Sequence, residues 1–479
     1  VYSVAHYTGE LVLELDFRPM FDFDDKGRIY SVTREDGCII IKYDKFTDNS
    51  LTHVDKTRFL AIKGAESFRH IGEWMKKDYT YDAMRKSRSE FYVYKALAVD
   101  VRGSAELVFS FADTKEKAKE HSETMQENKH YMLRSFNKYV THTFTSEDLA
   151  TNVAMKSLDD LLTSTERKER GVGIFAGLPW FYQFWARDEL VSLKALMLQN
   201  KHYLVKSILL KHLNIVSPDG LLQNKYPANP GDAKSIDAIG WLFFRLNEFI
   251  HLLEEKKLLQ EYLPEADLIL AKRTLEVAIR GLINSHSVNG LIINNEQETW
   301  MDTKPARRSG ACIEIQALFL SMLSLHTYLA KLTKTKQLFK AMEKDYRERM
   351  RSEFLRGVVL YDSLLLKENG FVPSDAIRPN IFLAYYIYPD FLEKKEWKQV
   401  FDNALKALWL DWGGLTTLNY TNPLFRSEYS GQGDESYHNG DSWFYVNNYA
   451  AIAMNRLDKD YYSKYVHRIM HASKEELLF

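Results

Sequence analysis

The feature that most limits how this chain can fold is a series of helix-forming segments from Ser146 to the end of the sequence. Apolar residues recur at helical spacing in eleven segments. They lie at 146–162, 187–199, 201–215, 235–255, 264–284, 309–331, 334–354, 375–388, 394–407, 442–456 and 459–477. Long loops follow alternate segments, so we expect helical hairpins that form an α/α toroid. Six hairpins need twelve helices, and the last helix of such a toroid is therefore expected to be absent from this chain.

The first 113 residues have the pattern of β-strands instead. Apolar and polar residues alternate, or β-branched and aromatic residues cluster, in four segments at 11–17, 38–44, 90–101 and 105–113. Turn-forming residues are expected to separate strands at 24–27, 34–37 and 102–104. Strands at this spacing predict an antiparallel β-sandwich.

The two patterns together predict an α+β protein of several domains. We expect a β-sandwich domain at 1–113, a charged linker helix at 114–144 and an α/α domain at 145–479 that is incomplete at its C-terminus. Ser146 is expected to cap the first helix of the last domain. The chain starts at Val1 without Met, so we also expect residues to precede it.

Composition excludes several classes of protein. The net charge is −1 and the isoelectric point about 7.0, without a basic stripe, so we expect no nucleic acid as partner. No run of about 18 apolar residues and no signal-peptide pattern occurs, so no membrane is expected either. Cys38 and Cys312 are far apart and form no disulfide framework, which favours a cytoplasmic location.

The sequence also lacks the common motifs of metal and cofactor sites. Residues 171–177 have three glycines, but their spacing and the absence of a preceding strand favour a flexible loop over a dinucleotide site. Zinc-ligand spacings and a serine-hydrolase elbow do not occur. Asp22, Asp24 and Asp25 are read as a solvated turn rather than a metal site. We therefore expect neither a metal nor a cofactor.

Acids and tryptophans that lie near helix ends point to a sugar site. Asp302 follows Trp300 and Met301, which could remove water from its carboxyl and raise its pKa. Cleavage of an acetal needs one such proton donor and a second carboxylate. A helix N-terminal acid or a salt bridge to Arg307 is the alternative for Asp302. Sugars stack on aromatic rings, and tryptophans close to loop signals occur at Trp180, Trp185, Trp241, Trp300 and Trp443.

Three further motifs contain candidates that bind sugar hydroxyls. Arg187 and Asp188 follow three aromatic residues and open an apolar helix, although charged pairs are also ordinary surface features. Asp237 is similar. His438 alone would be read as structural, but the hydrogen-bonding residues around it favour binding.

These motifs, taken in order, resemble the glucosidase part of glycogen-debranching enzymes, the amylo-α-1,6-glucosidases, chiefly of the archaeal and bacterial type. The family's motifs stand here as Pro179-Trp180-Phe181, Trp185-Ala186-Arg187-Asp188, Ser235-Ile236-Asp237-Ala238, Thr299 to Asp302, Glu314 to Leu318, Arg378-Pro379-Asn380 and Tyr437 to Gly440. The resemblance implies an (α/α)6 barrel after a β-sandwich, in the fold clan of glucoamylase. It also implies inverting release of glucose from α-1,6 branch points of glycogen-like α-glucans, without a metal or cofactor.

The resemblance also implies roles for single residues. Asp302 would be the general acid. The glucose subsite would be lined by Trp180, Trp185, Arg187, Asp188, Asp237, Glu314, Arg378 and His438. Trp300, within the Thr299 to Asp302 motif, and Asp441, directly after the Tyr437 to Gly440 motif, complete the list of expected substrate-binding residues.

Two departures from the family pattern bear on activity. Ala186 replaces the usual glycine, which is a small change. The family's general base is a glutamate beyond the Tyr437 to Gly440 motif, and no matching segment precedes Phe479. We therefore expect the base outside this chain, in a missing segment or a second chain, with Glu428, Glu435 and Asp441 as weaker substitutes. The alternatives are a glucoamylase or trehalase of the same fold, a phosphorylase, and a glucan-binding protein that does not hydrolyse.

Overall fold

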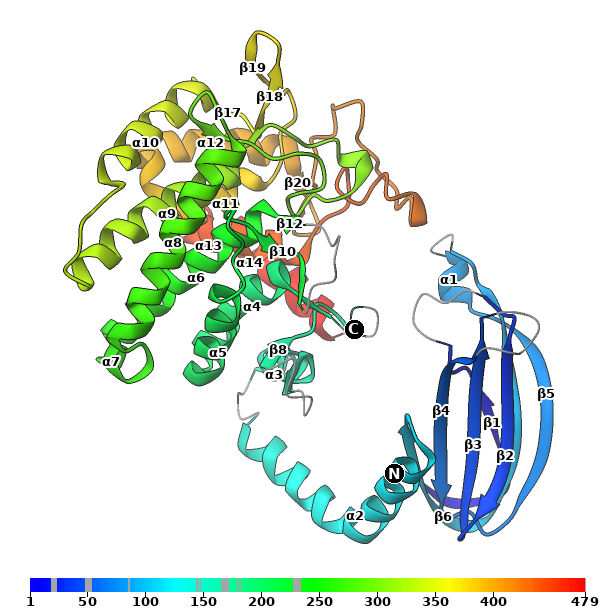
Figure 1. Ribbon diagram of the computed structural model, residues 1–479. Helices are drawn as coiled ribbons and strands as arrows, with labels where there is room; N and C mark the ends of the chain where they lie inside the picture. Colours follow the sequence, from blue (N-terminus) through cyan, green and yellow to red (C-terminus); the bar gives the residue numbers. More distant parts are fainter. Residues whose placement is uncertain are drawn as a thin grey trace. The chain divides into compact units, whose positions relative to one another are not determined.

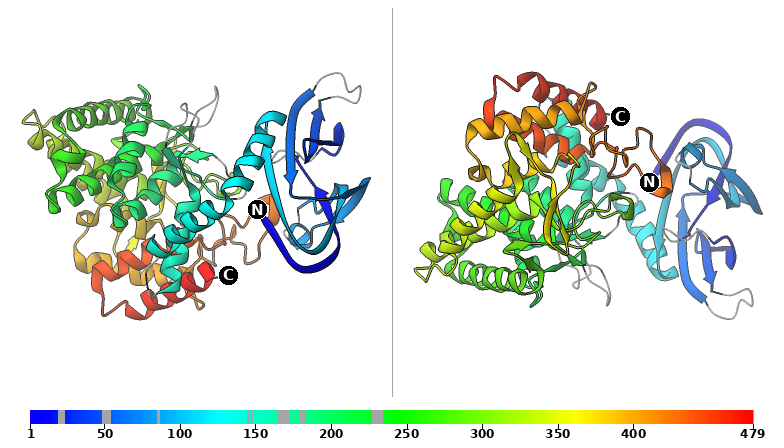
Figure 2. Two further views of the ribbon diagram at one scale, coloured as in Figure 1. Left: turned by 90° about the horizontal axis from the view of Figure 1, so that it is seen from below. Right: turned by 90° about the horizontal axis from the view of Figure 1, so that it is seen from above.

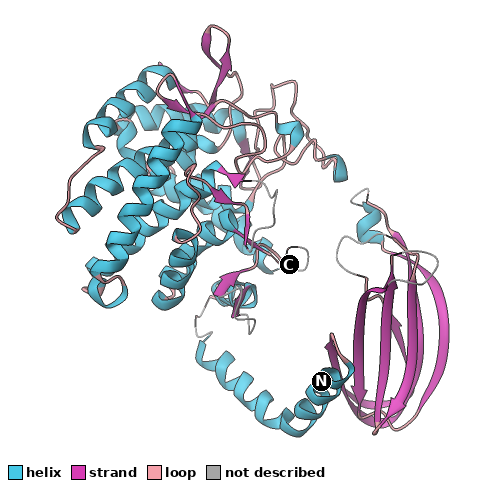
Figure 3. Ribbon diagram, in the orientation of Figure 1, coloured by secondary structure: helices cyan, strands magenta, loops and turns pink. Residues whose placement is uncertain are grey.

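The computed structural model describes residues 1–18, 24–47, 54–84, 87–143, 146, 148–164, 172–178, 181, 183–226 and 234–478. The chain divides into two compact units, Val1–Thr145 and Ser146–Phe479 (Figure 1). The first is built on strands and the second on helices, as the colours of Figure 3 show. We describe each unit by itself.

Six strands form one antiparallel sheet in the first unit. They are β1 (Tyr2–Leu15), β2 (Arg28–Glu35), β3 (Cys38–Phe46), β4 (Val54–Lys63), β5 (Phe68–Asp78) and β6 (Glu90–Ala112). Their order is β1-β6-β4-β3-β2, with β5 paired to β6. The rings of Tyr30 on β2 and Tyr94 on β6 stack 4.6 Å apart, although the two strands do not pair. The antiparallel pairing is as predicted, and the long β6 makes it a single sheet that folds over its own core.

The turn predicted at 102–104 is wrong. Strand β6 continues through these residues, and its partner β1 pairs with it on both sides, from Val4↔Ala105 to Thr8↔Arg102. Gly103 has a φ of +79°, and the register shifts between Val4 and Tyr7 opposite it. Arg-Gly-Ser therefore forms a bulge, because glycine permits the left-handed conformation without ending the strand.

The turn predicted at 34–37 is confirmed. Asp36 (φ 51°) and Gly37 (φ 77°) join β2 to β3. Two residues with positive φ are typical of a tight hairpin, and Asp-Gly favours it.

Two helices complete the first unit, α1 (Thr80–Met84) and α2 (Lys115–Thr143). The N-terminal part of α2 packs on the sheet, where Ala118 and Ser122 are buried and Ser122 Oγ lies 3.5 Å from Cys38 Sγ. This part of α2 thus belongs to the core of the unit instead of linking two bodies through solvent.

Eleven helices of eight or more residues occur in the described part of the second unit, one in each predicted segment. They are α3 (Leu149–Leu161), α4 (Ala186–Leu198), α5 (His202–Leu213), α6 (Ile236–Glu255), α8 (Glu265–His286), α9 (Ile313–Leu332), α10 (Lys340–Phe354), α11 (Asn380–Ile387), α12 (Lys394–Leu408), α13 (Phe444–Asp458) and α14 (Ser463–Leu478). A short helix, α7 (Leu259–Tyr262), and three 3-10 helices, η1 (Lys304–Ala306), η2 (Pro389–Phe391) and η3 (Gly431–Gly433), lie between them.

Several predicted helix starts are wrong. Asp148, not Ser146, is the N-cap of α3, and its side chain makes no capping bond to the helix backbone. Ser146 Oγ instead accepts from the Asp148 N–H at 3.2 Å. Helix α9 begins at Ile313 rather than 309, because Ala311 and Cys312 pair with the neighbouring hairpin as a short strand. Tertiary pairing thus shortens a helix that periodicity alone would extend.

Short strands shape the loops between the helices. They are β7 (Leu162–Ser164), β8 (Val172–Ile174), β9 (Phe184–Trp185), β10 (Leu222–Gln223), β11 (Lys225–Tyr226), β12 (Lys234–Ser235), β13 (Ser287–Val288), β14 (Leu291–Ile292), β15 (Ala311–Cys312), β16 (Leu355–Arg356), β17 (Val359–Leu360), β18 (Ser363–Lys367), β19 (Gly370–Pro373), β20 (Trp409–Leu410) and β21 (Gly414–Leu415). Strands β9, β12 and β15 run directly into α4, α6 and α9, so the residues at these junctions are held at both ends.

The helices of the second unit pack around one core (Figure 2). Helices α4, α6, α9, α11 and α13 contact one another in that order, and α5, α8 and α10 pack outside them. All eight residues of α11 are buried, whereas α12 buries only one face. Helix α9 is long and apolar enough to cross a membrane, but 83% of its apolar window is buried in this core.

Candidate functional site

A cavity of about 460 Å³ lies where three parts of the second unit meet. They are the loop before α4 with the start of that helix, the loop that carries Asp302, and the loop before α13 with the start of that helix. It is lined by Ala176, Phe181, Trp185, Arg187, Asp188, Val191, Ser192, Trp300, Asp302, Tyr437, Trp443 and Tyr445. Six of these residues are aromatic and three are charged. The cavity therefore combines flat apolar walls with a few polar groups, as small-molecule sites usually do.

Arg187, in the first turn of α4, connects that helix to the loop that carries Asp302 and to the junction of β12 and α6. Its Nε donates to Asp237 Oδ2 at 2.7 Å, and a terminal nitrogen donates to Asp302 Oδ2 at 3.2 Å. The other terminal nitrogen donates to Ser235 Oγ at 2.9 Å. Arg187 thus fixes the carboxyl of Asp302 relative to α4 and α6, although Asp302 itself lies outside any helix.

The Asp302 carboxyl is held in a partly dry environment. Burial raises its pKa above the ordinary value, Arg187 opposes this change, and the charge of Asp237 adds to it. The side chain still has 35% of its surface exposed, on the side of the cavity. Asp302 therefore keeps a proton to higher pH than an ordinary aspartic acid and can present it to a ligand.

Asp188 is the second carboxyl in the cavity wall. Burial raises its pKa to about 6, although Arg187 lowers it. The nearby charges of Asp302 and Asp237 raise it further. At neutral pH Asp188 is mostly ionised and can accept hydrogen bonds from hydroxyl groups.

Trp300 is the centre of the aromatic wall. Its Nε1 donates to Asn380 Oδ1 at 2.8 Å, and only 5% of the residue is exposed. The edges of His438, Trp443 and Tyr445 meet it at centroid distances of 5.3, 5.7 and 5.5 Å. Trp300 therefore supports the other rings of the wall as much as it faces the cavity.

His438 lies behind this wall and does not line the cavity. Its ring stacks on Trp443 at 5.3 Å, and its Nδ1 lies 2.9 Å from Thr303 Oγ1. Burial, together with nearby arginines such as Arg378, lowers the pKa of His438 to about 3, so the ring is neutral. Its contact with Thr303 holds the residue that follows Asp302.

Glu314 and Arg378 belong to a buried cluster centred on Arg308. The guanidinium of Arg308 donates to Asp362 Oδ2 at 2.8 Å and to Glu314 Oε2 at 2.6 Å. All three residues are 2–3% exposed. Arg378 donates to the Thr417 carbonyl at 3.0 Å, and burial lowers its pKa to about 10. Neither Glu314 nor Arg378 lines the cavity that contains Asp302.

The comparisons with known proteins bear on the helical unit. A family model described as amylo-alpha-1,6-glucosidase matches residues 156–477. The chain belongs to this family. The protein is therefore a glycoside hydrolase by family, and the resemblance drawn from its motifs is confirmed.

The fold is similar to that of solved glycosidases. A bacterial glucoamylase complexed with acarbose has a TM-score of 0.58 and 11% identity, over 92% of this chain and 75% of that one. A GH63 mannosylglycerate hydrolase from Thermus thermophilus, in complex with Tris and D-glycerate, has a TM-score of 0.50 and 12% identity, over 67% of this chain and 90% of that one. A search of curated proteins found no match. At these identities the likeness concerns the fold alone.

The structure brings about half of the predicted site residues of this glycosidase to the cavity. Trp185, Arg187, Asp188, Trp300 and Asp302 line it. Asp237 and His438 lie directly behind these residues, as the contacts above show. Trp180 lies outside the described residues, and Glu314, Arg378 and Asp441 are not in the cavity lining. For those four, a role in binding sugar stays a prediction.

The substitutes proposed for the general base lie elsewhere too. Glu435 pairs with Arg426 at 3.5 Å, Glu428 is exposed, and Asp441 accepts a hydrogen bond from Ser436 Oγ at 3.1 Å. None of the three lines the cavity among the described residues.

Sequence reasoning assigned no binding role to Tyr437, Tyr445 or Phe181, which line the cavity. Trp443, one of the tryptophans near loop signals, lines it too. The spacing of aromatic residues around the Tyr437 to Gly440 motif is a signal that could have identified Tyr437 and Tyr445. Over the residues that the structure describes, no group of three or more histidine, cysteine or acidic side chains could hold a metal ion.

Proposed function

We propose that the protein releases glucose from α-1,6 branch points of an α-glucan, with inversion, and that Asp302 is the general acid. The observation that carries the proposal is the Asp302 carboxyl, raised in pKa by burial and exposed to an aromatic cavity. Such a group can protonate a departing glycosidic oxygen. Membership of the amylo-alpha-1,6-glucosidase family supports the choice of linkage.

The contacts of Asp302 favour this role. Arg187 donates to Oδ2, and no described residue donates to Oδ1, so Oδ1 can carry the proton toward a substrate. Arg187 does not remove that proton, because burial outweighs its opposing charge and the pKa stays raised. Its remaining hydrogen bonds, to Asp237 and Ser235, keep the carboxyl in place during the reaction.

The rest of the cavity suits a glucose ring. The apolar C–H face of the sugar would lie on Trp185, Tyr437 or Trp443, and Asp188 would accept hydrogen bonds from its hydroxyl groups. We also propose that the series of helical hairpins belongs to an (α/α)6 barrel and that the protein acts in the cytoplasm. The fold likeness to glucoamylase supports the first of these.

The test is glucose release from three substrates under the same conditions, with and without added phosphate. We expect free glucose from a branched limit dextrin, and NMR should show the β-anomer first because inversion of an α-linkage produces it. Linear maltooligosaccharides and trehalose should react more slowly, and added phosphate should change nothing. The proposal would be contradicted if only the linear maltooligosaccharide or only trehalose reacted. It would also be contradicted if glucose release required phosphate.

Glucoamylase activity is the second candidate. The glucoamylase likeness extends over 92% of this chain, and thus over more than the helical unit. Glucose release from linear maltooligosaccharides at the rate seen with branched dextrin would favour this candidate. Glucan binding without any glucose release would favour a non-catalytic binding protein.

A further inference from the structure

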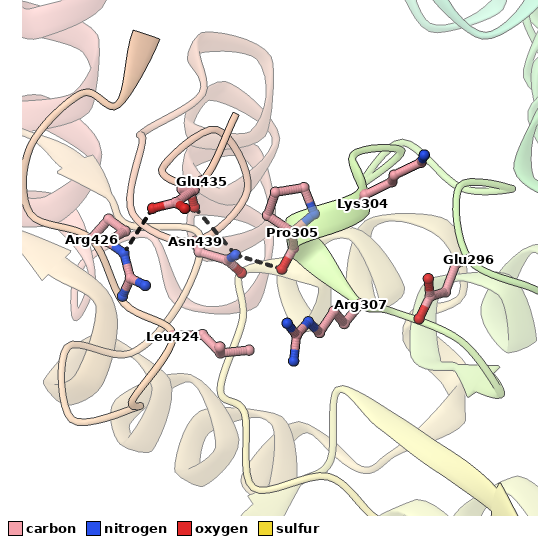
Figure 4. Close-up of a pocket in the computed structure, with 8 residues that line it drawn as sticks. All are labelled: Glu296, Lys304, Pro305, Arg307, Leu424, Arg426, Glu435 and Asn439. Atoms are coloured by element: carbon pink, nitrogen blue, oxygen red, sulfur yellow. Dashed lines mark hydrogen bonds and ion pairs between the residues drawn. The ribbon is translucent and has the colours of Figure 1, made fainter. Parts of the chain in front are cut away.

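A groove without aromatic side chains lies beside the loop that carries Asp302. It has a volume of about 390 Å³ and is lined by Glu296, Lys304, Pro305, Arg307, Leu424, Arg426, Glu435 and Asn439 (Figure 4). An adjoining hollow of about 310 Å³ shares Arg307 and Leu424 with it. We call these two hollows the charged groove. Each is within the size range of ligand pockets, roughly 300–1,000 Å³.

The charged groove and the cavity share one wall. Thr303 Oγ1 lies 2.9 Å from His438 Nδ1, and Asn439 Nδ2 donates to the Pro305 carbonyl at 2.9 Å. These contacts join the segment after Asp302 to the Tyr437 to Gly440 motif. Asp302 lines the cavity, whereas Pro305 and Asn439 line the groove. A chain attached to a sugar in the cavity would therefore have the groove close to the atom that Asp302 protonates.

The polar groups of the groove are of both signs. The guanidinium of Arg307 and the carboxylate of Glu296 form no hydrogen bond or ion pair with any residue that the structure describes. Figure 4 shows Arg307 extended toward the side of Leu424, with Glu296 on the opposite side. Arg426 and Glu435 pair with each other at 3.5 Å. An anion would meet Glu296 and a cation would meet Arg307, so the arrangement favours a neutral ligand with many hydroxyl groups.

The backbone of Arg307 adds a second observation. Its φ of 48° lies in the left-handed region, where a side chain with a Cβ costs about 1–2 kcal/mol. Its N–H donates to the Lys304 carbonyl at 3.2 Å and closes η1. Glycine would fit this position with less strain. An arginine kept here, with its guanidinium unpaired among the described residues, indicates a role beyond folding.

We propose that the charged groove binds the saccharide on the leaving-group side of the scissile bond. This inference rests on the proposed function, since it needs Asp302 to protonate an oxygen that joins two sugars. Arg307 would donate to hydroxyl oxygens of the departing α-glucan, and Glu296 would accept from its hydroxyl groups. The cavity would recognise one sugar through its aromatic side chains. The groove would bind the remaining chain through hydrogen bonds.

The test compares Arg307→Gly on two substrates. On a branched limit dextrin, kcat/KM should fall about 10-fold or more, the effect of losing a hydrogen bond to a charged group. On α-D-glucosyl fluoride, which has no leaving sugar, kcat/KM should stay within about 2-fold of wild type. The temperature of unfolding should not fall, because glycine suits the backbone. Equal loss on both substrates would overturn the inference.

Lys334→Gly is the matched control. Lys334 also has a left-handed φ, of 51°, but it follows α9 and lines neither the groove nor the cavity. This variant removes the same kind of side chain and strain, so it should act on both substrates like wild type. Glu296→Gln should keep wild-type stability. Its kcat/KM should fall on the dextrin but not on α-D-glucosyl fluoride. A loss on dextrin in Lys334→Gly would show that the Arg307 effect is unspecific.

A binding experiment separates this inference from the proposed function. Calorimetry with a linear maltooligosaccharide, the expected departing product, would compare Asp302→Asn with Asp302→Asn/Arg307→Gly. Weaker binding by the double variant supports the groove even if wild type never releases glucose, in which case only the proposed function fails. If both variants bind the oligosaccharide equally and the wild type releases glucose, the groove is not the binding site, while the proposed function stands.

Discussion

Two arginines in the helical unit each lie between two carboxylates, and only one of these clusters exposes a carboxylate to a cavity. Arg187 joins Asp237 and Asp302, and the Asp302 side chain is 35% exposed. Arg308 joins Glu314 and Asp362, and every member is at most 3% exposed. The same chemical group thus serves two ends. Beside the cavity the guanidinium holds the carboxyl that we propose as proton donor, and in the core it pairs with two buried carboxyls.

The largest expected effect on activity comes from a change in the cluster of Arg187, Asp237 and Asp302, which we call the open cluster. The cluster of Arg308, Glu314 and Asp362 is the sealed cluster. In Asp302→Asn the cavity keeps its shape but loses the proton, so glucose release should fall about 10²–10⁴-fold. The temperature of unfolding should change little, since an amide can still accept from Arg187. The control is Glu314→Gln in the sealed cluster, which should lower stability but leave the activity of the folded protein near wild type. Similar activity loss in both variants would remove the distinction between the clusters.

The next effect is on the sealed cluster. Arg308→Met leaves Glu314 buried without its ion-pair partner, and leaves Asp362 with only the more distant Arg378, whose Nε lies 4.0 Å from Asp362 Oδ2. The free energy of unfolding should fall by about 3–5 kcal/mol. Burial already raises the pKa of Glu314 and Arg308 opposes that change, so the variant should raise it further and its deficit should be larger at pH 7 than at pH 4.5. Urea denaturation at both pH values measures this. A deficit that does not depend on pH would argue against uncompensated charge as its cause.

Asp188 sharpens the comparison at the cavity wall. Its pKa of about 6 lies above the unfolded value near 4, so its contribution to stability is present below pH 4 and is lost as pH rises through 6. Asparagine does not ionise, so Asp188→Asn does not lose stability in this way as the pH rises. Relative to wild type it should therefore be more stable at pH 7 than at pH 4, by about 1–3 kcal/mol, while activity falls. Thermal unfolding of both proteins between pH 4 and pH 7 measures this. A difference in stability that does not change with pH would contradict the raised pKa of Asp188.

The smallest effect concerns the contact between Thr303 and His438. Thr303→Val removes a hydrogen bond and should lower the free energy of unfolding by about 1 kcal/mol. Because Thr303 follows Asp302, we also expect kcat to fall about 3–10-fold with little change in KM. Thr303→Ser keeps the hydroxyl and should behave like wild type. Wild-type behaviour of Thr303→Val, or damage by Thr303→Ser as large as that by valine, would contradict the assignment of the effect to this hydrogen bond.

Sequence reasoning predicted correctly those features whose pattern lies within a few neighbouring residues. Asp302, Arg187 and Asp188 were identified because each stands beside aromatic residues in a short motif, and the structure brings all three to one cavity. The Asp-Gly turn at 36–37 was likewise readable from two neighbouring residues. The Arg-Gly-Ser bulge was not, since only the pairing of β6 with β1 distinguishes a bulge from a turn.

The sequence by itself determined the two-part organisation, the series of helices and the family, because periodicity and motif order are properties of the chain. Only the tertiary structure decided which carboxylates face a cavity. Asp302 and Glu314 are both acids close to the start of α9, yet one is exposed to a cavity and the other is sealed by Arg308. Their burial depends on partners such as Asp362, 48 positions after Glu314, and no local pattern contains that information.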